Sequence, residues 1–259
     1  MTTNSIISIS GLRFSYGAPD PTVLENLSLE IPAGSITTVL GPNGTGKTTL
    51  LHLILGMLSP QAGSIQIDGR LQSKEARRHM SRLISLVPQG EYVAFDFSLL
   101  EYVLLGRAPY LGTLQLPSES DYEIALDALR STGLLELRHR PVPNLSGGER
   151  QLAMVARALA QQTSILLLDE PTSHLDLGNK WRVLNLLCDL SRKGVTIVLT
   201  THDPNIASAI ADHVVFVRDG NVLASGAKTD VFTSENLTRT YGLCVEVLEV
   251  RGKPMVLNA

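Results

Sequence analysis

The sequence has little cysteine, no long hydrophobic run and no excess of positive charge. Its two cysteines among 259 residues, Cys188 and Cys244, lie far apart and match no metal-binding spacing. This scarcity argues against a disulfide framework and favours a reducing compartment. The 22 lysines and arginines are outnumbered by 25 aspartates and glutamates, which leaves a net charge of -3. No overall basic field favours nucleic acid, and we expect no nucleic-acid partner.

The hydrophobic runs are too short to span a membrane. The most apolar stretch, residues 50–58, is interrupted by His52 and Gly56, whereas a spanning helix needs about 20 apolar residues. Residues 1–10 have neither the basic nor the apolar segment of a signal peptide, so none is expected. A hydrophobic content of 44% nevertheless excludes an intrinsically disordered chain. Any role at a membrane is therefore expected to depend on partner subunits.

Short apolar runs predict two kinds of strand. Alternating apolar residues between positions 6 and 31 indicate antiparallel strands. Four other runs are apolar mostly without alternation, as in strands that are buried on both faces of a parallel sheet. These runs are residues 36–40, 84–87, 165–168 and 195–199. The chain is therefore predicted to be an α/β protein with a mainly parallel sheet, preceded by a small antiparallel β layer.

Helical patterns lie between these runs. Residues 50–58 are apolar nearly all round, as in a helix buried against a sheet, and residues 181–190 continue to a basic last turn. Residues 98–160 are predicted to be mainly helical, except for an irregular stretch at 106–118 that contains two prolines. Residues 214–224 are typical of a β-hairpin. We therefore expect a helical insertion that interrupts the α/β core.

A glycine-rich loop supplies the strongest functional signal. Residues 41–48 read Gly-Pro-Asn-Gly-Thr-Gly-Lys-Thr, follow a predicted strand and open a predicted helix, which fits the phosphate-loop pattern G-x-x-x-x-G-K-[ST]. Glycines let backbone N–H groups approach a phosphate, Lys47 can reach the β- and γ-phosphates, and the Thr48 hydroxyl can bind Mg²⁺. A glycine-rich turn before a buried helix is the alternative. The expected nucleotide-binding residues are Gly41, Pro42, Asn43, Gly44, Thr45, Gly46, Lys47, Thr48 and Thr49.

A pair of carboxylates ends another predicted strand. Residues 165–168 are all apolar and are followed directly by Asp169 and Glu170. A buried strand carries Asp169 to the carboxyl edge of the sheet, where ligands bind in open α/β folds and a carboxylate can hold Mg²⁺, usually through water. Glu170 lies one residue farther out, where it can orient an attacking water or accept its proton. The alternative is an ordinary charged strand end.

Residues 145–151, Leu-Ser-Gly-Gly-Glu-Arg-Gln, precede a predicted helix. Ser146 and Glu149 have the spacing of a capping box. The cap does not explain Gly147 and Gly148, which expose two further backbone N–H groups at a helix N-terminus and so make a second anion-binding site. Two phosphate sites in one chain predict a nucleotide that is shared between two chains.

In this order, the phosphate loop, residues 145–151 and the Leu-Asp-Glu-Pro-Thr run at 168–172 resemble the nucleotide-binding subunit of ABC (ATP-binding cassette) transporters. The Leu-Ser-Gly-Gly-x-x-Gln element is the most specific part, and the resemblance covers about residues 6–226. It implies a phosphate-loop (RecA-like) core, ATP and Mg²⁺ as ligands, and ATP hydrolysis. The implied divisions are a single domain over residues 1–259, a helical subdomain inserted at about 90–160 and a C-terminal extension at about 227–259.

The resemblance also implies roles for single residues. Tyr16 matches the aromatic residue that stacks on adenine, although a lone tyrosine in such a turn is more often part of a core. Gln89 matches the glutamine that links Mg²⁺ and water to the helical subdomain, and His202 matches the switch histidine that contacts the γ-phosphate. The implied sets are Glu170, His202, Lys47 and Gln89 for catalysis, Thr48, Gln89 and Asp169 for Mg²⁺, and Ser146, Gly147 and Gly148 for the partner chain's nucleotide.

Three further segments extend the resemblance. Residues 173–176 match the loop that connects the two sites of a dimer, and His174, which replaces a commoner alanine, is also found there in importers of metal chelates. Residues 103–110 are similar to the V-x-x-G-R-x-P-Y segment of cassettes for iron-siderophore, haem and cobalamin importers, and residues 235–245 are similar to their tails. For residues 103–110 the alternative is simply a helix end followed by a loop. In related importers the groove beside Gln89 and this segment receives a short helix from the permease.

The function that the resemblance implies is ATP-driven import of an iron(III)-siderophore or a similar metal chelate. The implied partners are a second copy of the chain, integral-membrane permease subunits and, indirectly, an extracytoplasmic substrate-binding protein, with the chain at the cytoplasmic face of the cell membrane. Haem or cobalamin is an alternative cargo. Other functions stay open: a non-transport ABC ATPase such as one for iron–sulfur cluster assembly, an exporter cassette, and a regulatory module without turnover, against which Glu170 and His202 argue.

Overall fold

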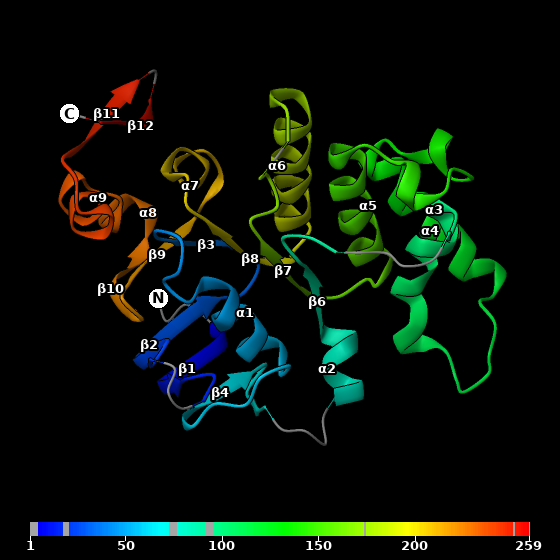
Figure 1. Ribbon diagram of the computed structural model, residues 1–259, viewed down its shortest axis with the longest axis horizontal. Coiled ribbons are helices and arrows are strands. Elements are labelled where there is room, and N and C mark those ends of the chain that lie inside the picture. The colour runs from blue at the N-terminus through cyan, green and yellow to red at the C-terminus, as the bar shows by residue number, and fades with distance from the viewer. Residues whose placement is uncertain are drawn as a thin grey trace.

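The computed structural model describes residues 5–17, 21–72, 77–91, 96–173, 175–250 and 252–258. These residues form a six-stranded sheet, a four-stranded sheet, a two-stranded hairpin and the helices around them. Figure 1 shows the sheets in the middle of the long axis, the helices α3, α4 and α5 towards one end, and the hairpin towards the other. This is the α/β architecture that the sequence predicts.

The central sheet is mainly parallel. Its strand order is β10-β9-β3-β8-β7-β6, and only β10 runs antiparallel to its neighbour among these described strands. The bounds are β3 Ile36–Leu40, β6 Ile84–Val87, β7 Ile165–Asp169, β8 Thr196–Thr201, β9 His213–Arg218 and β10 Asn221–Ala227. Strands β3, β7 and β8 are buried along their whole length, which explains their mostly apolar sequences. The four predicted strands and the hairpin are confirmed, with β8 ending two residues later than predicted.

The pairing of strands out of sequence order creates the site. Strands β3, β8 and β7 are neighbours, so their carboxyl ends lie at one edge of the sheet. The phosphate loop leaves β3 and enters α1 (Lys47–Leu55), Asp169 is the last residue of β7, and His202 follows β8. Residues as distant in sequence as Thr48 and Asp169, which are 121 positions apart, are thereby brought into contact.

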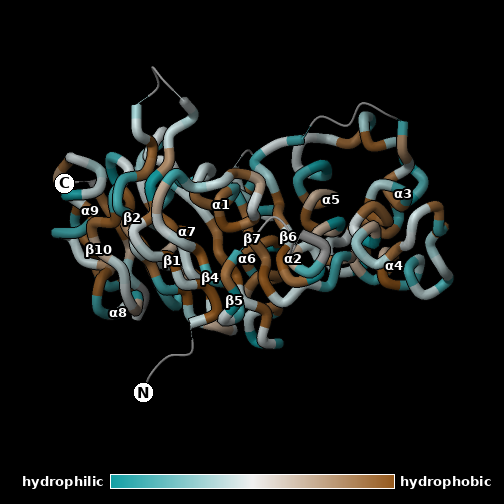
Figure 2. The backbone as a smooth tube through the Cα atoms, turned by 90° about the horizontal axis from the view of Figure 1, so that it is seen from below, coloured by the Kyte–Doolittle hydropathy of each residue, from teal (hydrophilic) through white to brown (hydrophobic). Residues whose placement is uncertain are grey.

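A smaller antiparallel sheet packs against α1. Its order is β2-β1-β4-β5, with β1 Ser5–Phe14, β2 Leu24–Pro32, β4 Ala62–Ile67 and β5 Arg70–Leu71. Its apolar face shares one core with α1 and the central sheet, and Figure 2 shows apolar segments gathered in this middle part of the molecule. The predicted antiparallel layer is therefore confirmed. Helix α1 ends at Leu55 rather than at the predicted residue 58, because Gly56 adopts the left-handed conformation (φ 78°) that ends helices.

Helices fill the region from Ser98 to Ala160. They are α3 Leu99–Leu104, α4 Glu119–Thr132 and α5 Gly147–Ala160, with short 3-10 helices η2 Leu105–Tyr110, η3 Leu135–Leu137 and η4 Val142–Asn144. The prediction of an irregular stretch at 106–118 is wrong in its first part, where η2 lies. A Cβ on Gly106 would lie 2.3 Å from the carbonyl oxygen of Arg157, so only glycine lets η2 pack this closely on α5. This tertiary contact leaves no trace in the local sequence pattern.

The remaining elements flank the central sheet. They are α2 Arg77–Leu83, α6 Leu177–Arg192, α7 Pro204–Ile210, α8 Lys228–Val231, α9 Ser234–Tyr241, β11 Val245–Val250 and β12 Lys253–Asn258. The hairpin β11–β12 packs on α7, and Val245 and Val256 join an apolar cluster with Phe216 and Leu237. Within the described residues, no helix has the length and apolar character needed to cross a membrane. The boundaries of the insertion and of the C-terminal extension stay predictions.

Candidate active site

The phosphate loop has a backbone that only glycines permit. Gly44 and Gly46 have φ values of 82° and 90°, and a Cβ on Gly41 would lie 2.2 Å from the carbonyl oxygen of Val217. A Cβ on Gly44 would meet no atom within 4 Å, so the loop presents its backbone to open space at this residue. Helix α1 then begins with no side-chain cap. A backbone cradle that ends at an uncapped helix N-terminus fits a phosphate group.

Lys47 lies folded back over this loop. Its ammonium group donates hydrogen bonds to the carbonyl oxygens of Gly41 and Pro42, both at 2.8 Å, and lies 3.9 Å from Glu170 Oε1. The side chain is 6% exposed. Burial lowers the pKa of Lys47, and the carboxylates of Glu170 and Asp169 oppose that effect. A cation is thus held at the inner side of the cradle, where it can meet the charge of a phosphate.

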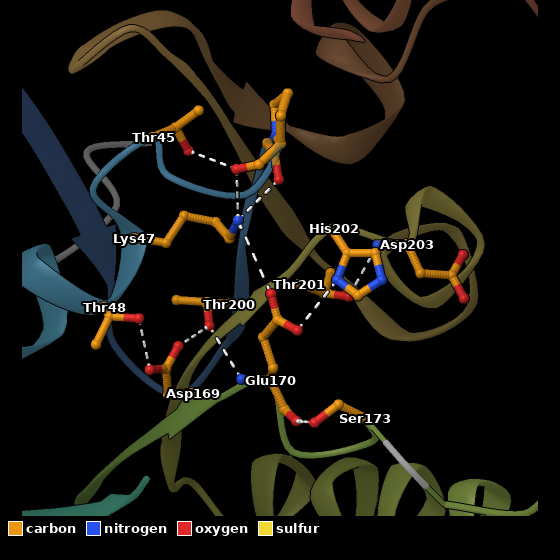
Figure 3. Close-up of polar contacts among 12 residues, drawn as sticks. Thr45, Lys47, Thr48, Asp169, Glu170, Ser173, Thr200, Thr201, His202 and Asp203 are labelled. Carbon is orange, nitrogen blue, oxygen red and sulfur yellow. Dashed lines mark hydrogen bonds and ion pairs between the residues drawn. The ribbon is translucent and has the colours of Figure 1, made fainter. Parts of the chain in front are cut away.

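Asp169 is fixed by two hydroxyl groups from different elements. Thr48 at the start of α1 donates to Asp169 Oδ2 at 2.7 Å, and Thr200 in β8 donates to Oδ1 at 2.6 Å (Figure 3). The amide of Glu170 in turn donates to the Thr200 hydroxyl at 3.0 Å. A threonine hydroxyl and a carboxylate in contact are hard oxygen donors of the kind that Mg²⁺ prefers. The donor set therefore fits the predicted metal.

Glu170 occupies a strained position between the side chains of Lys47 and His202. Its φ of 46° lies in the left-handed region, which is costly for a residue other than glycine and is often found at functional sites. Its carboxylate lies 3.1 Å from Nδ1 of His202 and 3.9 Å from Nζ of Lys47 (Figure 3). Ser173 donates to its carbonyl oxygen at 2.8 Å. The strained backbone therefore aims a buried carboxylate at the centre of the site.

One depression collects most of the predicted nucleotide-binding residues. It measures about 420 Å³ and is lined by Tyr16, Val23, Asn43, Gly44, Gly46, Lys47, Thr48, Thr49, Gln89 and Glu170. Tyr16 is 58% exposed, lies edge-on to Phe14 and shares a hydrogen bond of 3.0 Å with the Thr49 hydroxyl. Thr45 donates to the carbonyl oxygen of Pro42, which closes the loop from within. The depression thus joins a cradle for phosphates to an exposed aromatic ring.

The second predicted anion site lies apart from this depression. Ser146, Gly147 and Gly148, all of which the structure describes, are not among the residues that line it. They begin α5, where Ser146 and Glu149 form the predicted capping box: Glu149 N donates to Ser146 Oγ, and Ser146 N donates to Glu149 Oε2 at 2.7 Å. A nucleotide in the depression would not use both sites of one chain. His174 lies outside the described residues.

Two groups of residues escaped the sequence analysis. Thr200 joins the Asp169 carboxylate to the backbone amide of Glu170, and its sequence signal is a threonine at the end of an apolar run. Glu91, two residues after Gln89, accepts hydrogen bonds from Arg157 of α5 at 2.7 Å and from Tyr102 of α3 at 2.6 Å. These contacts connect the segment after Gln89 to the helical region, and no local sequence pattern predicts them.

The chain is similar to characterised proteins over nearly its whole length. The family model described as "ABC transporter" matches residues 24–173. The ferric enterobactin transport ATP-binding protein FepC of Escherichia coli (strain K12) is 37% identical over 258 residues, which are 98% of this chain and 95% of FepC. The hemin import ATP-binding protein HmuV of Nocardia farcinica (strain IFM 10152) is 40% identical and covers 95% of this chain and 85% of its own length.

Solved structures agree with these relatives. A metal-chelate type ABC transporter in an inward-facing conformation matches with a TM-score of 0.85 and 36% identity, over 99% of this chain and 98% of that one. The dimeric ATP-binding cassette MJ0796 bound to ADP and Pi matches with a TM-score of 0.77 and 28% identity, over 85% and 98% of the two chains. The phosphate loop, the paired carboxylates and the Leu-Ser-Gly-Gly helix start thus occur on the same fold as in these cassettes. The chain belongs to the ABC transporter family of ATP-binding, ATP-hydrolysing proteins.

Proposed function

We propose that this ATPase energises an importer of an iron(III)-siderophore or a similar metal chelate. The observation that carries the chemistry is the contact of Glu170 with both Lys47 and His202 beside the phosphate cradle. The importer assignment is supported by the relatives named for ferric enterobactin and hemin and by the metal-chelate transporter of the same fold.

In this proposal, α1 and its loop bind the phosphates of ATP. Backbone N–H groups from Gly44 to Thr48 approach the phosphate oxygens, and Lys47 leaves its carbonyl partners to meet the γ-phosphate. Thr48, Asp169 and Gln89 would hold Mg²⁺, which supplies positive charge that neutralises the phosphates. Tyr16, exposed at the rim, offers its ring face to the adenine base.

Glu170 is proposed as the general base. Its carboxylate accepts a proton from water while the water oxygen bonds to the γ-phosphorus and the bond from that phosphorus to ADP breaks. Lys47 and His202 flank the carboxylate and stabilise negative charge on the transferred phosphoryl group. The strained φ of Glu170, together with the hydrogen bond from its amide to Thr200, keeps the carboxylate aimed at this place.

A second copy of the chain would complete each site. The start of α5 carries Ser146, Gly147 and Gly148 outside the depression, so its N–H groups are available to the nucleotide of a partner. The dimeric cassette of the same fold supports this arrangement. Two ATP molecules would then lie between two chains, and hydrolysis would allow the two chains to separate.

Docking to a permease is proposed at a groove of about 900 Å³ beside the helical region. It is lined by the end of α1, by α2 and by α5, including Met57, Met80, Pro88 and Arg157. Met57 is 66% exposed although it is apolar, and Arg157 is the partner of Glu91 near Gln89. A short permease helix in this groove would place the chain at the cytoplasmic face of the membrane and would link it indirectly to an extracytoplasmic binding protein.

Hydrolysis is tested with Glu170→Gln. Loss of a general base lowers turnover by about 10²- to 10⁴-fold, while ATP binding is retained and the ATP-bound dimer accumulates. Phosphate release and size-exclusion chromatography measure both effects, with Glu123→Gln, on the exposed side of α4, as the control. Turnover of Glu170→Gln at the wild-type rate would remove Glu170 from this role.

The importer assignment is tested by pull-down from membranes. Wild-type protein should recover integral-membrane permease subunits, and Met57→Glu should lose them, whereas Leu71→Glu, at an exposed residue of β5 outside the groove, should not. Recovery of a protein complex without a permease would contradict the proposal and favour the iron–sulfur alternative. A deletion strain that fails to grow on siderophore-bound iron but grows on hemin supports the siderophore. The opposite growth pattern would indicate haem as the cargo. Haem is the second candidate because one relative is named for hemin import.

A further inference from the structure

The segment that follows β8 is held from the C-terminal extension. We call residues 201–208 the switch segment, because they contain His202; they run from the last residue of β8 into the first part of α7. The Tyr241 hydroxyl, at the end of α9, donates to the carbonyl oxygen of His202 at 2.8 Å. The amide of Val256 in β12 donates to Asn205 Oδ1 at 3.0 Å, and Ser208 Oγ donates to the carbonyl oxygen of Pro254. Three tethers thus connect the hairpin and α9 to this short segment.

Tyr241 is suited to act as a permanent donor. Burial and the negative charges of Asp203 and Glu170 raise its pKa, so the phenol keeps its proton at any physiological pH. The ring packs against the apolar cluster that contains Phe216 and Leu237. The hydroxyl is therefore held on a packed ring, and the negative charge of the Glu170 carboxylate acts on it.

His202 depends on its backbone for its position. Its side chain is 52% exposed, and the hydrogen bond of its ring to Glu170 spans 3.1 Å. Its neighbours are held on both sides: Asp203 N donates to the Thr201 hydroxyl, and the Asp203 carboxylate pairs with Lys180 of α6 at 3.0 Å. At His202 itself, the Tyr241 bond is the described contact that fixes the carbonyl group. A displacement of the backbone at His202 would carry the imidazole away from Glu170.

We propose that Tyr241 is a positioning residue for His202, and that the C-terminal extension serves to hold the switch segment in its hydrolysis-competent place. The matched family model covers residues 24–173, so this device lies outside it. The inference rests on the proposed role of His202 in hydrolysis. Tyr241 does not touch the nucleotide depression, whose lining residues do not include it among those that the structure describes.

The test is Tyr241→Phe in the full chain. The substitution keeps the ring and removes the hydroxyl, so folding and ATP binding should be preserved. We expect kcat to fall about 3- to 10-fold, as for the loss of one positioning hydrogen bond, with KM for ATP within about twofold of wild type. Thr240→Val is the matched control, because its hydroxyl bonds to the carbonyl oxygen of Asn236 within α9 and does not reach the switch segment.

A second variant and a direct readout separate positioning from general damage. Asn205→Ala removes the acceptor for Val256 N, and it should lower kcat in the same direction by a smaller factor. The NMR signal of the His202 ring, assigned by its loss in His202→Gln, should shift or broaden in Tyr241→Phe and stay unchanged in Thr240→Val. Wild-type kcat in Tyr241→Phe, or an equal loss in Thr240→Val, would overturn the inference. If His202→Gln itself hydrolyses ATP normally, the proposed role of His202 fails instead.

Discussion

The helices of the insertion and the helix of the phosphate loop begin in opposite ways. Helices α3, α4 and α5 each begin with a complete capping box, in which the serines Ser98, Ser118 and Ser146 pair with Glu101, Asp121 and Glu149. Helix α1 follows Gly46, which provides no side-chain cap, and has no acidic residue in its first turn. A cap satisfies backbone N–H groups and stabilises the fold, whereas an uncapped N-terminus leaves them for a ligand. The starts of α3 and α4 thus stabilise the insertion, whereas the start of α1 is left open to a ligand.

Helix α5 combines both patterns. Gly147 and Gly148 leave its first turn open, but Glu149 accepts a hydrogen bond from Ser146 N and pairs with Arg140 at 3.8 Å. The hydrogen bond from the Ser146 backbone holds the pKa of Glu149 below its usual value, so a negative charge stays at this N-terminus. Helix α1 instead begins with Lys47 and has no acidic residue in its first turn. We therefore expect α1 to bind ATP in the monomer and α5 to act only on a nucleotide already bound by a partner.

The largest expected effect follows from removing the cation of α1. In Lys47→Ala, ATP affinity of the monomer should fall by about 100-fold or more, because a buried charge that meets phosphate is lost. Phosphate release should fall with it. Titration with a fluorescent ATP analogue measures the affinity, and Lys193→Ala, at an exposed residue just after α6, is the control. Binding within about threefold of wild type would show that α1 is not the principal phosphate site.

Blocking α5 should separate binding from hydrolysis. Ser146→Arg places a bulky side chain at the helix start, so hydrolysis should fall by about 100-fold or more because the partner's γ-phosphate loses its preorganised donors. ATP affinity of the monomer should stay within about twofold. The titration with a fluorescent ATP analogue measures the affinity, and a phosphate-release assay measures the rate of hydrolysis. Equal loss of monomer binding would place both anion sites on one nucleotide and contradict the shared arrangement.

The caps of the insertion should report on stability rather than activity. Asp121 completes the cap of α4 and pairs with buried Arg107 at 2.8 Å. Asp121→Asn leaves the guanidinium without its anion and should lower the free energy of unfolding by about 3 kcal/mol at pH 7. Urea unfolding measures the change. If Asp121→Asn lowers the free energy of unfolding no more than Glu123→Gln on the same helix, the ion pair between Arg107 and Asp121 does not stabilise the fold.

The same residue predicts a pH dependence. Hydrogen bonds from Ser118, with those from Arg107, lower the pKa of Asp121 to about 2. A carboxylate whose pKa is lowered by folding stabilises the folded state fully at pH values above its pKa in the unfolded chain, which is about 4 for aspartate. This stabilisation disappears as the pH falls towards about 2. The difference in unfolding free energy between wild type and Asp121→Asn, measured in the urea assay above, should therefore narrow as the pH falls from about 4 towards 2. A constant gap would mean that the carboxylate charge is not its source.

The smallest effect is expected at Glu149. Glutamine also completes a capping box, so Glu149→Gln should change the free energy of unfolding by less than about 1 kcal/mol. It removes a negative charge from the proposed site of the partner's phosphate, and ATP-dependent dimerisation should strengthen by about two- to fivefold. Analytical ultracentrifugation with the Glu170→Gln background measures the dimer. Weaker dimerisation would show that the carboxylate itself contacts the partner.

Much of the fold could be predicted because its signals are local. The buried strands are short apolar runs, the capping boxes depend on residues three positions apart, and the phosphate loop is a contiguous pattern of glycines around Lys47. The end of α1 and the 3-10 helix η2 were missed for a different reason. Gly56 ends one element with a left-handed backbone and Gly106 admits close packing in the other, and sequence alone does not distinguish these two uses of glycine.

The sequence by itself determined which groups could bind a phosphate and where each lies along the chain. Only the tertiary structure decided which of them meet. Strand order β3-β8-β7 puts Thr48, Thr200 and Asp169 in contact, and the packing of α9 against β9 brings Tyr241 to His202. The reason is physical: local patterns follow from the backbone and its nearest side chains, whereas these contacts follow from how distant apolar faces pack together.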